Sequence, residues 1–578
     1  MSVGSTGKDF SKQRKKLLSS ERGTIYKKSF SLRVALGFPN SYEVGMSNLG
    51  YQTIYRLLNQ TEGVVCERFF AKLFDEMLDF SMHRGVRTLE SNINIRSFDI
   101  IAFSVPFELD YLNILKLLKI SGIPLISSQR GTGEPLIIAG GVAITLNPET
   151  VAPFFDCLLI GEAEEALPDF IRTYSQSAKK RISKEATLLN LSRIKGVYVP
   201  QFYDIVYDRE GKIKKREIRK GVSELIERRK ADVGKIETFS PISSPYIHFK
   251  NSLLVEVGRG CVRGCRFCAA GHIYRPCRFH DKESVVTQVE NHIGENLHVG
   301  LVGSLISDHP DLENICSDLY LRGLEIGVSS LRVDKISSNL MEILIKSGLK
   351  TLTVAPEVGS EKMWRVINKN ISREDVLKSA KIAAEAGICN LKLYFIIGLP
   401  FEKKEDIEGI IDLIHQIHEV YIKSPVSKQK WLESPKREAH RRRRLVLSIN
   451  PFVPKPHTPF QWTAMNREKE LKSKMKRIES EVKNLKGVHL EKKSIRQAIL
   501  QGILSVGNRR VGEGLFYHIQ ENLTFPQAWR KAGVNIDSII FREKDFSSSL
   551  PWDILDSGIN KSSLIKEFEK AKKIGEEF

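Results

Sequence analysis

The chain has 578 residues, 41% hydrophobic and 27% charged, which is enough for two to four domains with ample cores. No run approaches 18 uninterrupted apolar residues, which argues against a membrane span, and 8 cysteines without a signal peptide indicate a reducing cytoplasm rather than a disulfide framework. The net charge of +20 favours a polyanionic partner, RNA before DNA or lipid, although charge in tails and in one insert can simply be solvated.

The first third of the chain predicts a Rossmann-like, doubly wound α/β domain at residues 31–175, after a flexible N-terminus at 1–30. Short apolar runs typical of strands alternate with helical segments such as Tyr111–Ile120. Glycine pairs and turns close two of these strands at Gly140-Gly141 and Gly161-Glu162, at the strand ends where such sheets bind ligands. The predicted strands are Leu32–Phe38, Asp99–Val105, Leu136–Ala139 and Cys157–Ile160.

A polar and basic stretch at 176–247, with short strands at 196–199 and 204–207, is interpreted as a linker subdomain. Residues 248–486 then repeat a strand–loop–helix unit six times, which predicts a partial (β/α)6 barrel with chemistry at the carboxyl ends of the strands. Residues 487–578 predict a small, mostly helical domain, in which Leu550-Pro-Trp-Asp553 is expected to form a buried aromatic corner. The six strands are expected at Ser252–Val257, Val299–Gly303, Glu325–Ser329, Thr351–Ala355, Asn390–Ile397 and Leu445–Ile449, with helices such as Glu283–His292, Ser338–Ser347 and Lys404–Ile417 between them.

Directly after the first of these six strands stand Cys261, Cys265 and Cys268, in the run Gly-Arg-Gly-Cys-Val-Arg-Gly-Cys-Arg-Phe-Cys-Ala-Ala-Gly. Three thiolates at this spacing can hold three irons of a 4Fe-4S cube and leave the fourth iron open for S-adenosylmethionine. Structural zinc, the alternative, needs four ligands, and the fourth would have to be Cys277 or His272 because no second cysteine pair exists. The other cysteines stand singly and are expected to be small core residues, with Cys277 nearest the motif.

The cysteine spacing, the aromatic Phe267 and the flanking glycines resemble the radical S-adenosylmethionine (radical SAM) superfamily. That resemblance implies reductive cleavage of S-adenosylmethionine to a 5′-deoxyadenosyl radical, and a low-potential electron donor such as ferredoxin or flavodoxin. Phe267 is then expected to pack over the adenine or the edge of the cluster.

The front domain resembles the cobalamin-binding-like domain that precedes many radical enzymes, on the basis of Ser104, Ile138-Ala-Gly-Gly141, Asn147-Pro-Glu149 and residues 156–165. It departs from that pattern after the first strand, where residues 39–50 lack the Asp-x-His-x-x-Gly loop that supplies an axial histidine. The resemblance therefore implies either cobalamin with no histidine beneath the cobalt or a vestigial scaffold. A cobalamin pocket is expected from the loops that carry Ser104, Gly140, Gly141 and Gly161.

The remaining strand ends of the barrel carry groups that the superfamily uses for S-adenosylmethionine. Gly303 and Ser304 stand at the position of the glycine-rich turn, with Ser304 where an acid is usual. Arg332 is the candidate for the methionine carboxylate, Glu357 for the ribose hydroxyls or the ammonium, and Gly398 for the adenine. In the alternative, Arg332 and Glu357 pair with each other and Gly398 is turn chemistry alone.

Several longer motifs together resemble one bacterial family of largely uncharacterised radical SAM proteins, and this resemblance covers nearly the whole chain but implies no substrate. The basic stretch at 423–444 could grip phosphates or be a solvated insertion. Phe452, Phe460 and Trp462 could line the substrate mouth or cap the bottom of the barrel. The motifs are Gly45–Gly50, Pro356–Ser360 with Val366–Lys369, Lys392–Pro400 and Phe452–Trp462.

Two enzyme functions and one other function are compatible with these features. Radical-based methylation of an unactivated carbon follows if the front domain binds cobalamin, and modification of tRNA or ribosomal components akin to methylthiolation fits the basic charge. Methylthiolation usually needs a second cluster, for which the front domain offers only Cys66 and Cys157. A non-catalytic iron–sulfur sensor or assembly protein is the third interpretation, and it would need neither an open iron nor the polar strand ends.

Overall fold

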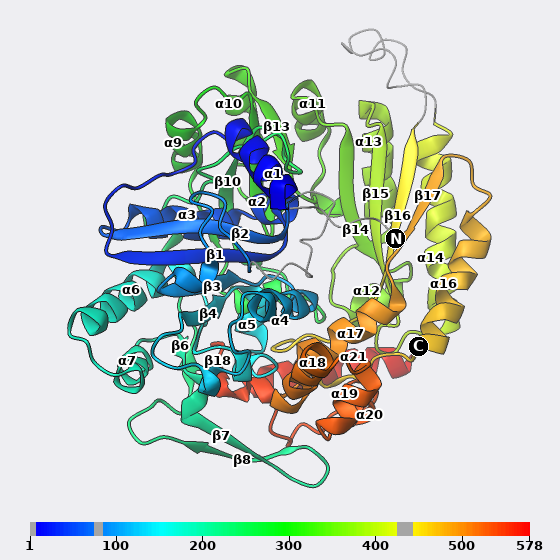
Figure 1. Cartoon of the computed structure of the whole chain (residues 1–578). Coiled ribbons are helices and arrows are strands. Elements are labelled where there is room, and N and C mark those ends of the chain that lie inside the picture. Colours follow the sequence, from blue (N-terminus) through cyan, green and yellow to red (C-terminus); the bar gives the residue numbers. More distant parts are fainter. Residues whose placement is uncertain (1–6, 74–84, 425–442, 578) are drawn as a thin grey trace. The chain divides into compact units, whose positions relative to one another are not determined.

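The computed structural model describes residues 7–73, 85–424 and 443–577 and divides into two compact units (Figure 1). The first comprises Met1–Ser252, Ile503–Ile539 and Asp545–Gly558, and the second comprises Leu253–Gly502, Ile540–Lys544 and Ile559–Phe578. Residues 487–578, which the sequence predicts as a separate helical domain, are thus divided between the two units. Within the described part of the chain, no helix is both long and apolar enough to cross a bilayer.

The first unit contains a six-stranded sheet in the order β2-β1-β3-β4-β5-β6. Strands β1 to β5 are parallel and β6 is antiparallel to β5, which confirms the doubly wound α/β prediction. Because parallel sheets are covered on both faces, their strands are apolar throughout, and β3, β4 and β5 have this composition. The strands are β1 (Leu32–Ser41), β2 (Val64–Lys72), β3 (Ile100–Ser104), β4 (Leu136–Gly140), β5 (Cys157–Leu159) and β6 (Val197–Tyr198).

Helices connect these strands, and short strands complete the first unit. Because β6 joins the main sheet, the stretch predicted as a linker subdomain contributes directly to this fold. Two small two-stranded sheets lie outside the main sheet. One is the hairpin of β7 (Tyr203–Tyr207) and β8 (Ile213–Ile218), and the other pairs β9 (Ile226–Glu227) with β18 (Leu555–Asp556). The helices are α1 (Gly7–Ser20), α2 (Tyr42–Met46), α3 (Leu49–Gln60), α4 (Tyr111–Ile120), α5 (Val142–Leu146), α6 (Ala163–Lys179), α7 (Lys184–Leu191), α18 (Arg509–Glu521), α19 (Phe525–Lys531) and α20 (Ile536–Ile540).

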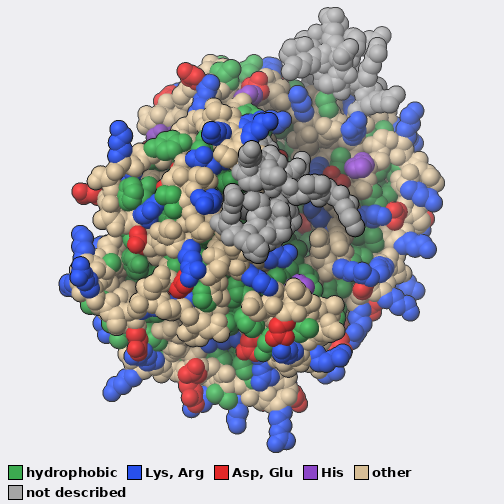
Figure 2. All heavy atoms as spheres, viewed as in Figure 1, with side chains coloured by type: hydrophobic (Ala, Val, Ile, Leu, Met, Phe, Trp, Pro, Cys, Tyr) green, Lys and Arg blue, Asp and Glu red, His purple; other side chains and the backbone are tan. Residues whose placement is uncertain are grey.

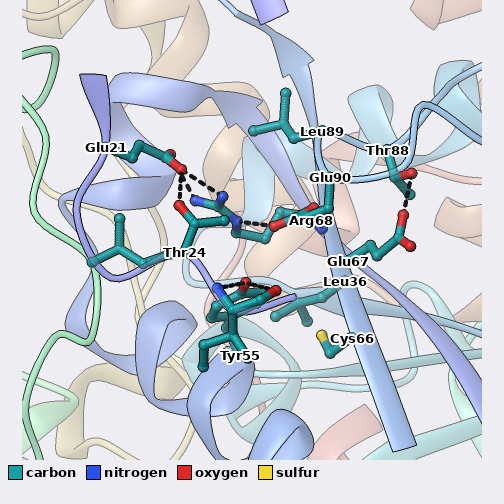
Figure 3. Close-up of polar contacts among 12 residues, drawn as sticks. Glu21, Thr24, Leu36, Tyr55, Cys66, Glu67, Arg68, Thr88, Leu89 and Glu90 are labelled. Carbon is teal, nitrogen blue, oxygen red and sulfur yellow. Dashed lines mark hydrogen bonds and ion pairs between the residues drawn. The ribbon is translucent and has the colours of Figure 1, made fainter. Parts of the chain in front are cut away.

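A buried charge cluster fixes the N-terminal segment to the edge of this sheet (Figure 3). Arg68 on β2 has a fully buried side chain and pairs with Glu21 at 2.7 Å and with Glu90 at 2.6 Å. Arg14 of α1 donates to the carbonyls of Leu89 and Glu90. Residues 7–30 therefore differ from the predicted flexible N-terminus, because Arg14 and Glu21 are held by partners 47 to 76 residues away in the sequence.

The second unit contains two four-stranded sheets, β11-β10-β12-β13 and β14-β15-β16-β17, linked by a parallel bridge between Leu331 and Val354. All six predicted barrel strands are present, and the short β11 and β17 are two further strands that were not predicted. The sequence of β17, Val-His-Leu-Glu-Lys, has no apolar run that would mark a strand, and all five residues are half-exposed or exposed. The strands are β10 (Ser252–Arg259), β11 (Arg278–Phe279), β12 (His298–Gly303), β13 (Glu325–Val328), β14 (Thr351–Glu357), β15 (Asn390–Ile397), β16 (Arg444–Pro451) and β17 (Val488–Lys492).

Amphipathic helices cover the outer face of these strands, as expected for a partial barrel. On β15 the residues Leu391, Leu393, Phe395 and Ile397 are buried while those between them are only half-buried. The helices are α8 (Ala270–Ile273), α9 (Lys282–His292), α10 (Leu312–Leu321), α11 (Ser338–Lys346), α12 (Glu361–Val366), α13 (Arg373–Ala386), α14 (Lys404–Ile417), α16 (Glu468–Val482), α17 (Ile495–Val506, which continues into the first unit) and α21 (Lys561–Glu577).

Candidate functional site

The cysteine loop leaves the carboxyl end of β10 and returns through β11, which pairs antiparallel with it. Gly260 opens the loop with a φ of +88°, and a Cβ there would lie 2.3 Å from the carbonyl oxygen of Tyr274. Only glycine therefore permits this close approach of the two ends of the loop. The loop lies at the strand end where a β/α barrel carries its chemistry.

The three thiols of the motif lie close enough to influence one another's protonation. Burial raises the pKa of Cys265 to about 11, and the neighbouring Cys268 and Cys261 contribute in the same direction. Burial also raises the pKa of Cys261 and Cys268, which accept hydrogen bonds from backbone N–H groups: Arg263 for Cys261, and Ala270 and Gly271 for Cys268. Such thiols become thiolates only when a cation or a metal cluster compensates the buried charge.

Among the described residues, no three His, Cys, Asp or Glu side chains converge on one metal-ion position. A mononuclear zinc site needs ligands that all meet at one atom. In a 4Fe-4S cube each thiolate binds a different iron, so the ligands need only surround a common volume. Three partly buried thiols on one loop fit this requirement.

The C-terminal end of α12 and the residues directly after it anchor the cysteine loop. Arg266, between the second and third cysteines, is 4% exposed, and its guanidinium donates to the carbonyls of Arg365 and Val366 at 2.8 Å. The same guanidinium binds Glu567 of α21 at 2.9 Å. Asn368 donates its side-chain amide to the carbonyl of Gly264 at 3.0 Å. No local sequence pattern marks these anchors, because they depend on contacts between residues 99 to 301 positions apart.

Arg332 lies near the cysteine loop but is held by acids. Its guanidinium makes two hydrogen bonds to Asp334, at 2.9 and 3.1 Å, and lies 4.0 Å from Asp308. Asp308 also pairs with Arg263 of the cysteine loop. Ser304 itself is exposed, and the acid that follows it after this strand is Asp308, four residues later.

Glu357 ends β14 in the left-handed region, at a φ of +69°, and pairs with Lys369 at 2.9 Å. The alternative in which Arg332 pairs with Glu357 is therefore wrong. Lys369 is a cation that the sequence analysis missed, and it opposes the effect of burial on the pKa of Cys265. The two side chains are 10% and 13% exposed, so a nearly buried ion pair of Lys369 and Glu357 lies beside the thiols.

The remaining candidates for the S-adenosylmethionine site are Gly303, Gly398 and Phe267. Gly303 ends β12, where a Cβ would lie 3.0 Å from the carbonyl of Gly258. Gly398 has a φ of +79°, and its backbone N–H donates to the carboxylate of Glu402. A Cβ at position 398 would lie 2.7 Å from the side chain of Leu471. This geometry supports the alternative of turn chemistry. Phe267 is half-buried within the loop.

The aromatic run after β16 belongs to the core of the second unit. Phe452, Phe460 and Trp462 are at most 3% exposed, and Trp462 contacts Phe568 of α21. They therefore do not line an open mouth. The basic stretch at 423–444 falls mainly outside the described residues, which omit 425–442. In the first unit, Trp552 is 1% exposed, in agreement with a buried aromatic corner.

At the ligand end of the front sheet, two glycines face the chain's own backbone. Gly141 has a φ of +113°, and a Cβ there would lie 2.6 Å from the carbonyl oxygen of Val105. Gly161 approaches Arg229 in the same way, at 2.3 Å. Gly140 is less confined, with its nearest neighbour at 3.4 Å, and Ser104 is 6% exposed. The need for glycine at 141 and 161 thus arises from packing of the chain on itself.

The motif Asn147-Pro-Glu149 fixes the C-terminal part of the first unit to the sheet. Asn147 donates to the carbonyls of Ser505 and Gly507 at 3.0 and 2.8 Å. Glu149, 1% exposed, pairs with Arg509 at 2.9 Å and accepts a hydrogen bond from Tyr198. This motif has a structural role within the unit.

Family models match both halves of the chain. Residues 50–200 match the model described as radical SAM proteins, N-terminal, and residues 255–414 match the radical SAM superfamily model. Together they cover just over half of the chain.

Relatives include the uncharacterized protein MJ0966 of Methanocaldococcus jannaschii, 29% identical over 486 residues, which are 84% of this chain and 90% of that protein. The ribosomal protein uS12 methylthiotransferase RimO of Thermodesulfovibrio yellowstonii is 24% identical over 28% of this chain and 41% of its own length. Among solved structures, the radical SAM methyltransferase TsrM of Kitasatospora setae gives a TM-score of 0.46 at 13% identity, covering 75% of each chain. The cobalamin-dependent S-adenosylmethionine radical enzyme OxsB gives 0.46 at 13% identity, covering 94% of this chain and 79% of that one.

Proposed function

Since the chain belongs to the radical SAM superfamily, we propose that it binds a 4Fe-4S cluster through Cys261, Cys265 and Cys268 and uses S-adenosylmethionine to methylate an unactivated carbon with cobalamin in its front domain. The observation that supports the first part is the group of three neighbouring thiols at the end of β10, anchored by Arg266 and Asn368. A bound cluster would supply the electron that cleaves S-adenosylmethionine to a 5′-deoxyadenosyl radical.

The residues around the thiols have roles that follow from their charges. Lys369 and Arg332 place positive charge beside the thiols, which favours a cluster that carries thiolate ligands. Glu357 and Asp308 offer carboxylates for the ammonium or the hydroxyl groups of S-adenosylmethionine, and both cations can receive its carboxylate. In this proposal the existing pairs, Lys369 with Glu357 and Arg332 with Asp334, hold these side chains in place before the cofactor binds.

Methylthiolation of a ribosomal or RNA substrate is the second candidate, favoured by the similarity to RimO and by the net charge of +20. The state of the front-domain cysteines weakens it. Cys66 and Cys157 have no exposed surface, and burial raises the pKa of each thiol well above its usual value. Two buried neutral thiols do not make a second cluster site. In both candidates a low-potential donor such as ferredoxin or flavodoxin would supply the electron.

The test is anaerobic reconstitution with iron and sulfide, followed by reduction with dithionite in the presence of S-adenosylmethionine. We expect about four irons per chain and formation of 5′-deoxyadenosine. Cys265→Ala should lose both, whereas Cys389→Ala, which removes a half-buried cysteine outside the motif, should retain both. A Cys265→Ala variant with its full iron content and cleavage activity would refute the assignment.

A further inference from the structure

The strand order of the first unit reverses direction between β1 and β3. β1 pairs with β2 on one side and with β3 on the other, and all three strands are parallel. The chain therefore continues from β1 toward one edge of the sheet and from β3 toward the other. In open α/β sheets the loops separate at this point, and ligands bind in the crevice that results.

Buried polar groups lie where β1 and β3 end. Asp110, 4% exposed, accepts a hydrogen bond from the side-chain amide of Asn40 at 2.9 Å, which joins the loop after β3 to the end of β1. Burial raises the pKa of Asp110 to about 7, and the nearby Glu108 contributes. The hydroxyl of Tyr111 is buried and has no hydrogen-bond partner among the described residues. A ligand with amide or hydroxyl groups would satisfy it.

Charge and exposure at this end of the sheet narrow the class of ligand. The segments 40–55, 105–115, 141–151 and 160–171, which follow β1, β3, β4 and β5, contain no Lys or Arg in a chain of net charge +20. A ligand held through its phosphate groups would find no charge-assisted partner on them. Val44 and Phe107, at 38% and 39% exposed, add apolar surface on the loops after β1 and β3. These features suit a flat, amide-bearing ligand without net negative charge.

An imidazole lies beside the loop after β1, although that loop has no histidine of its own. The backbone N–H of His248 donates to Ser47 Oγ at 3.0 Å, and its Nδ1 lies 3.3 Å from Oε1 of Glu43. Its Nε2 has no partner among the described residues, and the side chain is 61% exposed. A carboxylate on one ring nitrogen fixes the tautomer and leaves the other nitrogen as a metal ligand.

We infer that the β1/β3 crevice is the corrinoid site and that His248, oriented by Glu43, is the imidazole that binds the cobalt. This inference rests on the cobalamin part of the proposed function, and it replaces the expectation of a cobalt with no histidine beneath it. The imidazole comes from a position 200 residues after the loop, so a search for the Asp-x-His-x-x-Gly motif does not find it.

The experiment is electron paramagnetic resonance of the full-length protein loaded with cob(II)alamin and, separately, with cob(II)inamide. Cobinamide lacks the nucleotide base, so nitrogen superhyperfine splitting of its cobalt signal can come only from a protein side chain. We expect triplet splitting in the wild type and none in His248→Ala, with cobinamide affinity lowered by about tenfold or more in His248→Ala and in Glu43→Gln. Phe107→Glu should also weaken binding, and flavin mononucleotide should not bind.

His298→Ala is the matched control, because His298 forms a similar exposed pair with Glu325, at 2.9 Å, in the second unit. It should leave the spectrum and the affinity unchanged, and all variants should keep their iron. If the wild type binds cobinamide but shows no splitting, or if His248→Ala retains the splitting, the inference fails while cobalamin-dependent methylation stands. If the wild type binds neither corrinoid, the cobalamin part of the proposed function fails.

Discussion

Replacement of Arg68 by methionine should destabilise the first unit and release its N-terminal helix. Arg68 has no exposed side-chain surface, and its removal leaves Glu21 and Glu90 buried without their cation. Removing one partner of a buried ion pair typically costs about 3–5 kcal/mol. At about 2–4 °C per kcal/mol in a large domain, the melting temperature of the unit should fall by roughly 6–20 °C.

The dependence on pH provides a second measure of this effect. Burial alone would raise the pKa of Glu21, but the Arg68 charge and its hydrogen bonds outweigh burial and hold that pKa below its usual value. Burial raises the pKa of Glu90, which Arg68 offsets only in part. Without Arg68, both carboxyl groups should have raised pKa values in the folded state. The stability lost in Arg68→Met should then be smaller at pH 5, where they are protonated, than at pH 8.

The assay is urea unfolding at both pH values, combined with hydrogen exchange of residues 10–24. Arg172→Met is the control, because Arg172 forms a pair with Asp169 at 64% exposure and should contribute less than about 1 kcal/mol. A triple variant that adds Glu21→Gln and Glu90→Gln removes the buried charges and should recover part of the loss. If Arg68→Met unfolds within 1 kcal/mol of the wild type at both pH values, the buried cluster does not stabilise the unit as argued.

Three further predictions concern the two units. The pKa of Asp110 is raised from 3.8 to about 7, so the free energy of unfolding of the wild type should fall by up to about 4 kcal/mol as the pH rises from 4 to 7. Asp110→Asn should remove this pH dependence, which urea titrations measure. Gly141→Ala, with its Cβ 2.6 Å from a carbonyl oxygen, should cost about 1–3 kcal/mol or more in thermal unfolding, whereas Gly140→Ala should cost much less. Arg266→Ala should lower the iron bound per chain after reconstitution, since the cysteine loop loses its contacts with Arg365, Val366 and Glu567, while the equally charged Arg322→Ala on the surface should not.

Six strands of the barrel were predictable from the sequence because each is a short apolar run and amphipathic helices separate them. The predicted strand at Asn390–Ile397 and the helix at Lys404–Ile417 have the same bounds in the structure. The cysteine motif was predictable for a similar reason, since its three ligands lie within eight residues of one another. Local pattern is sufficient where the partners of a residue are local.

Strand β2 shows where local pattern fails. Its sequence, Val-Val-Cys-Glu-Arg-Phe-Phe-Ala-Lys, places Glu67 and Arg68 in the middle of an apolar run, and charged residues normally exclude a buried strand. Both are buried because Glu67 accepts hydrogen bonds from Thr88 and Ser91 while Arg68 meets Glu21 and Glu90. Those partners come from segments that a single-sequence pattern cannot bring together.

The distribution of basic residues bears on the choice between the two candidate functions. Some of the basic charge is internal, as with Arg68, Arg130 and Arg509, which are paired with buried acids. On the face seen in Figure 2, Lys and Arg side chains are spread among other residues and do not form one continuous patch. The segments that follow β1, β3, β4 and β5 have none, whereas Lys72 ends β2. An RNA substrate held through its phosphates needs several cations on one surface, and nine Lys or Arg residues lie at 423–444, mostly outside the described residues. The three cysteines are common to both candidates, so the preference for radical-based methylation rests on the corrinoid site that we propose at the β1/β3 crevice.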